Sequence, residues 1–202
     1  KVSSGMITTV AGNGSCGYDG DGGAATSASL YNPQAVAVDA GGNLYIAEYS
    51  LANFSNCRVR EVSGGTITTV AGNGICGYGG DGGAATSASL SLPQGVAVDA
   101  AGKLFIADAH NCRVRMVNSG TITTVAGNGS CGYSGDGGAA ASASINNPND
   151  IAVDSGSALY IADTYNCLVR MVSGGTITTV AGNGACSYLG DGGDGGAATA
   201  AA

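Results

Sequence analysis

The stretch "QGVAVDAAGKLFIADAHNCRVRMVNSGTITTVAG", residues 94–127, decides the fold because its apolar residues fall into four short runs. Small and branched apolar residues alternate in 94–100, and a second run follows a glycine-containing turn at 104–108. Two further runs, at 112–117 and 122–127, flank the turn "NSGT". Four short strands joined by such turns predict a four-stranded antiparallel sheet, the unit of a β-propeller blade.

The same pattern recurs along the chain with a long period. "ITTVAGNG" begins at Ile7, Ile67, Ile122 and Ile177, so the first period is 60 residues and the next two are 55. Extra residues in "YSLANFS", 49–55, lengthen the first period and indicate a surface loop. Solenoid coils have periods nearer ~20–30 residues, so propeller blades are favoured over a β-solenoid.

Composition narrows the function classes. The chain has 202 residues, of which 37 are glycine and only 10% are charged, and this favours tight turns over long helices. Its net charge of −7 disfavours nucleic-acid binding, which needs a basic surface. No apolar run approaches the ~20 residues of a membrane span. The chain begins inside one repeat and ends with "GGAATAAA", so we expect a processed chain or an excerpt of a longer one.

Three longer segments carry a family resemblance. The runs P-x-x-(V/I)-A-V-D, L-(Y/F)-I-A-(D/E) and N-x-(R/L)-V-R recur within Pro33 to Arg60, Pro93 to Arg115 and Pro148 to Arg170. Through them, almost the whole chain resembles the NHL-repeat family, although Cys stands where Asn-His-Leu has His. The resemblance implies an all-β protein of NHL-like four-stranded antiparallel β-propeller blades, commonly six to a ring.

The repeats predict about three blades in this chain. We expect blades at 33–72, 93–127 and 148–182, joined by linkers at 73–92 and 128–147. Residues 1–32 would be the end of a preceding blade plus a linker loop, and 183–202 a linker to a missing next blade. Three blades do not close a ring, so the chain is either part of a longer one or associates to bury its open edges.

The seven cysteines are regularly spaced. Three separations of 19 residues predict these disulfides: Cys57–Cys76, Cys112–Cys131 and Cys167–Cys186. A hairpin brings the start of one strand beside the end of the next, within reach of a disulfide. Cys16 would then pair with an upstream or intermolecular partner. A shifted set is the alternative: Cys16–Cys57, Cys76–Cys112 and Cys131–Cys167. Regular disulfides imply an extracellular or cell-surface protein.

The glycine-rich linkers contain two ligand-like motifs. Gly12-x-Gly14-x-x-Gly17 matches a dinucleotide fingerprint, but the following "YDGDGG" cannot start the helix that such a site requires. The acidic loops offer weak calcium candidates: Asp19, Asp21, Asp191 and Asp194. The Asp that recurs in every linker is expected instead to order its own turn by accepting backbone N–H bonds. We therefore predict no cofactor, with calcium as the alternative.

Charged residues recur at two places in the blade. The acids that precede the Asn-Cys corner are expected to pair with Arg58 or Arg113, or to bond the loop backbone; they are Glu48, Asp108 and Asp163. A second set is expected to form a structural row: Arg60, Arg115 and Arg170. Three sequons suggest N-glycosylation: Asn13, Asn53 and Asn128, of which Asn53 in the variable loop is the best candidate.

Catalysis has little support in the sequence, because His110 is the only histidine and no nucleophile–His–acid spacing is present. We predict a non-catalytic extracellular structural or interaction protein, such as a subunit of a filament or surface assembly. Its partners would be copies of itself, another extracellular protein or a glycan. The alternatives are a ligand-binding propeller for protein or glycan, and a fragment of a lyase- or lactonase-like propeller enzyme.

Overall fold

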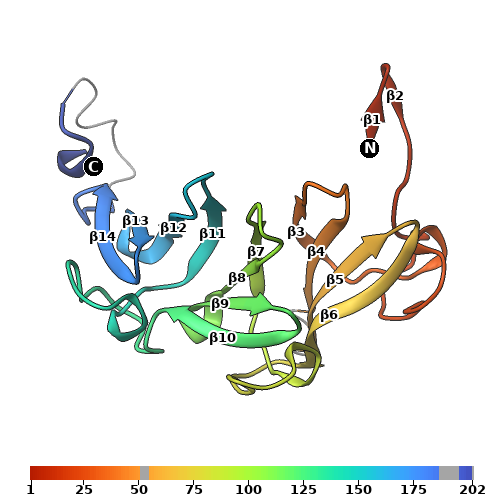
Figure 1. Ribbon diagram of the computed structural model, residues 1–202, viewed down its shortest axis with the longest axis horizontal. Helices are drawn as coiled ribbons and strands as arrows, with labels where there is room; N and C mark the ends of the chain where they lie inside the picture. Colours follow the sequence, from red (N-terminus) through yellow and green to blue (C-terminus); the bar gives the residue numbers. More distant parts are fainter. Residues whose placement is uncertain (51–54, 187–195, 202) are drawn as a thin grey trace.

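The computed structural model describes residues 1–50, 55–186 and 196–201. Three four-stranded antiparallel sheets stand side by side in an open arc, with the chain termini at its two ends (Figure 1). The described residues contain no α-helix, only short 3-10 turns and strands. The protein is all-β and built of propeller blades that do not close a ring.

Each sheet is one blade, and its strands follow one another in chain order. Blade 1 consists of β3 (Pro33–Val38), β4 (Leu44–Ser50), β5 (Ser55–Ser63) and β6 (Thr66–Ile75). Blade 2 consists of β7 (Pro93–Val98), β8 (Leu104–Asp108), β9 (Arg113–Asn118) and β10 (Thr121–Ala126). Blade 3 consists of β11 (Pro148–Val153), β12 (Leu159–Asp163), β13 (Leu168–Ser173) and β14 (Thr176–Ala181).

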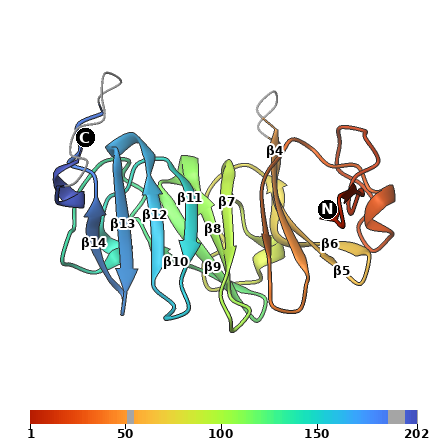
Figure 2. The same cartoon turned by 90° about the horizontal axis from the view of Figure 1, so that it is seen from above.

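The first strands of the blades, β3, β7 and β11, lie next to one another on the concave side of the arc, and Figure 2 shows the row of blades from above. Alanine and glycine in these strands suit the close approach of neighbouring blades. Gly95 has no room for a side chain, because an added Cβ would lie 2.8 Å from the Cα of Asp150 in the next blade. The crowded centre therefore explains the small residues in the first strands.

Blades pack through two apolar faces. We call the face toward the preceding blade the leading face and the face toward the following blade the trailing face. The trailing face of blade 1, with Ala47 and Val59, packs in one buried cluster with Ile106 and Ile122 on the leading face of blade 2. An equivalent cluster joins blade 2 to blade 3. Most of the core therefore lies between the blades. A third cluster packs Ala25 and Ala28 on Ile46 and Ile67 of blade 1.

An aspartate orders the turn after each first strand. Oδ1 of Asp99 accepts hydrogen bonds from the backbone N–H groups of Ala101 and Lys103, both at 2.9 Å. Asp39 and Asp154 make corresponding bonds in the other blades. These aspartates order the hairpin turns.

The first copy of "ITTV" differs from its repeats. Residues 7–10 read as a full strand, yet only a short hairpin of β1 (Val2–Ser3) and β2 (Met6–Ile7) forms there. In the blades, this segment pairs with the third strand of its own sheet, as β10 pairs with β9. The hairpin keeps the end of that ladder, because Val2 pairs with Ile7 as Val62 pairs with Ile67 in blade 1.

None of the helices in the described parts of the chain is long and apolar enough to cross a membrane.

Candidate functional site

The segments between blades bring together most of the chemically distinctive residues. We call them straps; they begin at the recurring cysteines and span residues 16–32, 76–92 and 131–147. A fourth begins at Cys186 and is described at 186 and 196–201. Each of the first three straps contains a 3-10 turn: η1 (Ala25–Ser27), η2 (Ala85–Ser87) and η4 (Ala140–Ser142). The fourth contains η6 (Ala198–Ala200).

A disulfide ties each strap except the first to the blade that it leaves. Cys57 bonds to Cys76, Cys112 to Cys131 and Cys167 to Cys186, with Cα–Cα separations of 5.3, 5.3 and 5.4 Å. These are the pairs that the 19-residue spacing predicts, and the shifted set does not occur. Cys16 is free and exposed, so its predicted partner is not among the described residues.

Hydrogen bonds hold each strap on the blade that it enters. In the second strap, the backbone N–H of Gly82 donates to Ile122 O at 2.8 Å, and that of Ala85 donates to Gly120 O at 2.8 Å. The corner Asn111, in η3 (Ala109–Asn111), donates from Nδ2 to Gly77 O at 2.8 Å. The second and third straps are thus covalent to one blade and hydrogen-bonded to the next.

A buried arginine lies beneath each strap. Arg115 is fully buried, and its Nη2 lies 2.5 Å from Oδ1 of the strap residue Asp81. Its Nη1 lies 3.3 Å from Oδ2 of Asp108, which is also fully buried. The same three-membered group occurs in the other blades as Asp21–Arg60–Glu48 and Asp136–Arg170–Asp163. A buried guanidinium needs these partners, because an unpaired charge in the core is very costly.

Two expectations about these acids were wrong. The recurring strap Asp does not order its own turn: Asp21 accepts from Arg60, from the Tyr18 hydroxyl at 2.9 Å and from the Thr69 N–H at 3.0 Å. These donors include groups about 40 to 50 residues away, which short-range turn rules cannot reveal. The corner acids form their ion pairs with Arg60, Arg115 and Arg170 rather than with Arg58 or Arg113, while the alternative, bonding to loop backbone, is confirmed because each also accepts from a backbone N–H of the linker.

The two acids around each buried arginine have pKa values that are shifted in opposite directions. It raises the pKa of Asp108 to about 6, although hydrogen bonds from Asn111 and Ser91 and the Arg115 charge act to lower it. Burial likewise raises the pKa of Glu48 and of Asp163. For the strap acids burial also acts upward, but hydrogen bonds and the arginine charge outweigh it, so the pKa is lowered; these acids are Asp21, Asp81 and Asp136.

A second arginine lies outside the first in two of the three blades. The guanidinium carbon of Arg58 lies 3.6 Å from the ring centroid of Tyr18, and that of Arg113 lies 3.7 Å from the ring centroid of Tyr78. These strap tyrosines therefore pack on the blade that their strap enters. At the equivalent position blade 3 has Leu168, and its strap tyrosine faces only Arg170, at 4.8 Å.

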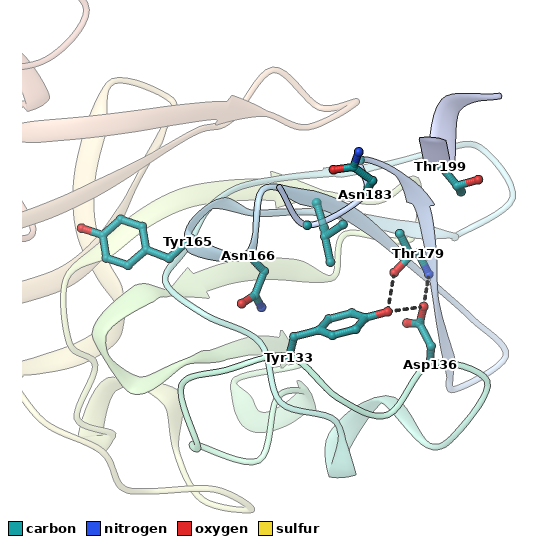
Figure 3. A pocket seen from close by; sticks show the side chains of 10 residues that line it. Tyr133, Asp136, Tyr165, Asn166, Thr179, Asn183 and Thr199 are labelled. Atoms are coloured by element: carbon teal, nitrogen blue, oxygen red, sulfur yellow. Dashed lines mark hydrogen bonds between the residues drawn. The ribbon is translucent and has the colours of Figure 1, made fainter. Parts of the chain in front are cut away.

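The surface has hollows at this corner of blade 3 and along the open side of blade 1. The first, of about 540 Å³, is lined among others by Tyr133, Asn166 and Asn183 (Figure 3). The second, of about 830 Å³, is largely apolar and includes Val36 and Val38 on the leading face of blade 1. A third, of about 770 Å³, adjoins the free Cys16.

The remaining predicted site residues are dispersed. Asp19 accepts hydrogen bonds from Ser29 N at 2.7 Å and Ser29 Oγ at 3.1 Å, and Asp21 holds Arg60, whereas Asp191 and Asp194 lie outside the described residues. The described residues contain no group of three or more His, Cys, Asp or Glu that could hold a metal ion. His110 is exposed at the corner of blade 2.

The sequon asparagines Asn13 and Asn128 lie in the turns that precede their straps. Each donates from Nδ2 to a strap carbonyl at 3.0 Å, so each amide nitrogen is engaged within the fold. Asn53 lies outside the described residues. Glycosylation of all three stays a prediction.

Known proteins match part of the chain in sequence and a larger part in structure. The family profile of the teneurin NHL domain matches residues 55–134. Teneurin-4 of Homo sapiens and teneurin-4 of Mus musculus are each 37% identical over 105 residues, which cover 46% of this chain and 4% of each relative. The chain therefore spans a small fraction of these curated relatives.

Two solved structures from Bacteroides thetaiotaomicron have a similar fold. One, a structural genomics protein of unknown function, is 19% identical with a TM-score of 0.53, covering 69% of this chain and 46% of its own. The other, described as a candidate phosphatase, is 17% identical with a TM-score of 0.55, covering 77% of this chain and 36% of its own. At such low identity these similarities concern the fold alone.

Proposed function

Because the chain belongs to the NHL-repeat family, we propose that it is a non-catalytic extracellular interaction module whose open blade faces bind a second copy of the chain. One observation carries this proposal. Val36 on the leading face of blade 1 is 62% exposed, whereas the equivalent Val96 and Ile151 are 5% and 6% exposed. A position built for burial between blades is therefore open at one end of the arc.

The other end of the arc offers the complementary face. Val169 on the trailing face of blade 3 is 37% exposed, while the equivalent Val59 and Val114 are fully buried. Trailing and leading faces already pack on each other twice within the chain. A contact between blade 3 of one copy and blade 1 of another would repeat that packing, with residues of the same kind on both sides.

The contact requires one strap to move. The chain carries four straps for three blades, so a junction between copies would hold two straps where an internal junction holds one. The first strap is fixed on blade 1 by the ion pair between Asp21 and Arg60 at 2.6 Å. We therefore expect the C-terminal strap of the neighbouring copy to be displaced on association.

A trailing-to-leading contact joins different surfaces of the two copies. Such a contact closes into a ring if the rotation between copies permits it, and otherwise continues as a filament. We propose that the chain is a subunit of a filament or surface assembly. We place this assembly outside the cell because the three disulfides suit an oxidising compartment. The proposal includes no metal, because Asp21 and Asp81 each hold a buried guanidinium.

Sedimentation velocity across a range of protein concentrations tests the proposal. We expect the oxidised chain to associate with increasing concentration, and expect the double variant Val36→Glu, Val38→Glu to stay monomeric. Ala100→Glu, in an exposed turn of blade 2, is the matched control and should associate like the parent chain. A parent chain that stays monomeric throughout would overturn the proposal.

A further inference from the structure

The corners of the three blades differ by one residue that follows the Asn-Cys pair. Blades 1 and 2 carry Arg58 and Arg113 there, and blade 3 carries Leu168. Arg113 donates from Nη1 to Asn111 O at 3.0 Å and from Nη2 to Asn128 O at 2.8 Å, with its guanidinium over the Tyr78 ring. A ring and two carbonyls thus hold a planar cation at this corner.

Blade 3 retains the groups that would hold such a cation. We call them the cradle: the Tyr133 ring, the backbone carbonyls of Asn166 and Asn183, and Gly184. The backbone around them is folded as in blade 2. Gly182 N–H donates to Ala198 O at 3.0 Å, as Gly127 N–H donates to Ala140 O at 3.0 Å.

The corner asparagine is also held as in blade 2. Asn166, in η5 (Thr164–Asn166), donates to Gly132 O and to Asp163 Oδ2, both at 2.9 Å. The hydroxyl of Tyr133 donates to Oδ2 of Asp136 at 3.1 Å and so fixes the ring (Figure 3). The cradle is therefore formed in advance, although Leu168 has no donor to offer it.

Among the described residues, the space for a guanidinium is open in blade 3 and filled in blades 1 and 2. A Cβ added at Gly74 or Gly129 would overlap the guanidinium of Arg58 or Arg113. A Cβ added at Gly184 would have only one atom within 4 Å, Asn166 O at 3.8 Å. The hollow of about 540 Å³ lies at this place, with Tyr133, Asn166 and Asn183 around it (Figure 3).

We propose that the cradle of blade 3 binds a guanidinium group supplied from outside the chain, as the side chain of an arginine on a partner protein. Arginine fits better than lysine, because its planar fork can stack on a ring while donating to two separate acceptors. The net charge of −7 also favours approach of a cation. This proposal is independent of the self-association proposal, which rests on Val36, Val38 and the blade faces.

Titration with a small peptide-like probe tests the site. N-acetyl-arginine-N-methylamide added to the oxidised chain should bind once, with a Kd of about a millimolar for so small a ligand. Amide chemical shifts of Tyr133, Asn166 and Gly184 should report the binding. The corresponding lysine and citrulline compounds should bind at least ~10-fold more weakly, because neither provides a charged fork.

Two variants provide matched controls, because each copies a residue that the chain already carries in another blade. Leu168→Arg should fill the cradle and abolish probe binding. Arg113→Leu should open an equivalent cradle in blade 2 and raise the stoichiometry from one to two. Thermal unfolding of both variants checks that they remain folded.

Several outcomes would overturn the proposal. These are equal binding of the citrulline compound, unchanged binding by Leu168→Arg, or a stoichiometry of one in folded Arg113→Leu. Binding of free arginine without binding of the blocked probe would point to a free amino acid and would also overturn the assignment to a partner protein. Dilute, monomeric protein is used throughout, so that the C-terminal strap, whose Ala198 O accepts from Gly182 N–H, stays in place.

Discussion

Val36 and Val96 occupy the same position on the first strands of consecutive blades, yet Val36 is 62% exposed and Val96 is 5% exposed. The flanking sequences, "PQAVAVDA" and "PQGVAVDA", differ by a single residue. Burial of this side chain is therefore decided by the adjacent blade and not by the repeat itself. In such an array most of the stabilisation resides in the interfaces between repeats, so equivalent substitutions should have unequal effects.

The largest effect on stability should come from placing a charge at Val96, the buried member of the pair Val36 and Val96. Val96→Asp buries a carboxylate between blades 1 and 2 and should lower the free energy of unfolding by about 3–5 kcal/mol. Val36→Asp, on the open face, should change it by no more than ~0.5 kcal/mol. Urea unfolding of dilute protein, followed by circular dichroism, measures both. Similar losses in the free energy of unfolding would show that the adjacent blade does not decide the effect of the substitution.

Removing one disulfide should have the next largest effect on the free energy of unfolding. The double variant Cys112→Ala, Cys131→Ala opens a loop closed across 19 residues and should cost about 3 kcal/mol in the chain-entropy treatment. Cys16→Ala removes an exposed thiol without a bond and should leave stability unchanged. Urea midpoints under non-reducing conditions compare the two variants. A comparable loss in Cys16→Ala would mean that this thiol contributes to the fold.

The pH dependence should distinguish a buried corner acid from a strap acid. The pKa of Asp108 is about 6 in the folded chain against an ordinary value of 3.8, so the folded state binds more protons between these values. The free energy of unfolding should therefore fall as pH rises through this window, by at most ~3 kcal/mol for this residue. In Asp108→Asn that fall should be smaller.

The strap acids act in the opposite sense. Asp21, Asp81 and Asp136 have lowered pKa values in the folded chain. Each therefore stabilises the fold at a pH above the ordinary carboxyl pKa, and this stabilisation is lost as the pH falls through the folded-state pKa. Stability should therefore be greatest near pH ~4. A stability curve that rises steadily from pH 4 to pH 7 would contradict the buried position of Asp108.

The smallest effect concerns the strap tyrosines. Tyr78 lies 3.7 Å from Arg113 and 5.1 Å from Arg115, whereas Tyr133 has only Arg170 within this range, at 4.8 Å. Tyr78→Leu should therefore cost about 0.5–1 kcal/mol more than Tyr133→Leu. Paired thermal and urea unfolding of the two variants measures the difference. Equal costs would mean that the outer arginine adds nothing to the contact.

The sequence was sufficient where the determining contacts lie within one repeat. The four strands of a blade follow from alternating apolar runs, and the cysteine pairs follow from a spacing contained in one hairpin. The turns at Asp39, Asp99 and Asp154 are local in the same way, because their acceptors and donors are at most four residues apart.

Contacts between a strap and the following blade were beyond the reach of such reasoning. Asp21 bonds to Arg60, 39 residues away, and this pairing requires the strap to lie across the third and fourth strands. Leu168 is visible in the sequence as a departure from Arg58 and Arg113. Its consequence appears only when the ring, the two carbonyls and Gly184 are placed around it.

The placement of each disulfide within one repeat has a further consequence for how such a chain can change in length. Both cysteines of each bonded pair fall within a single repeat, 19 residues apart in a 55-residue period. A duplication or deletion of one whole period would therefore add or remove a complete pair and leave the other bonded pairs intact. An array of this kind can be lengthened by repeat duplication without oxidative mispairing, and the near-identity of successive repeats is compatible with growth by that route.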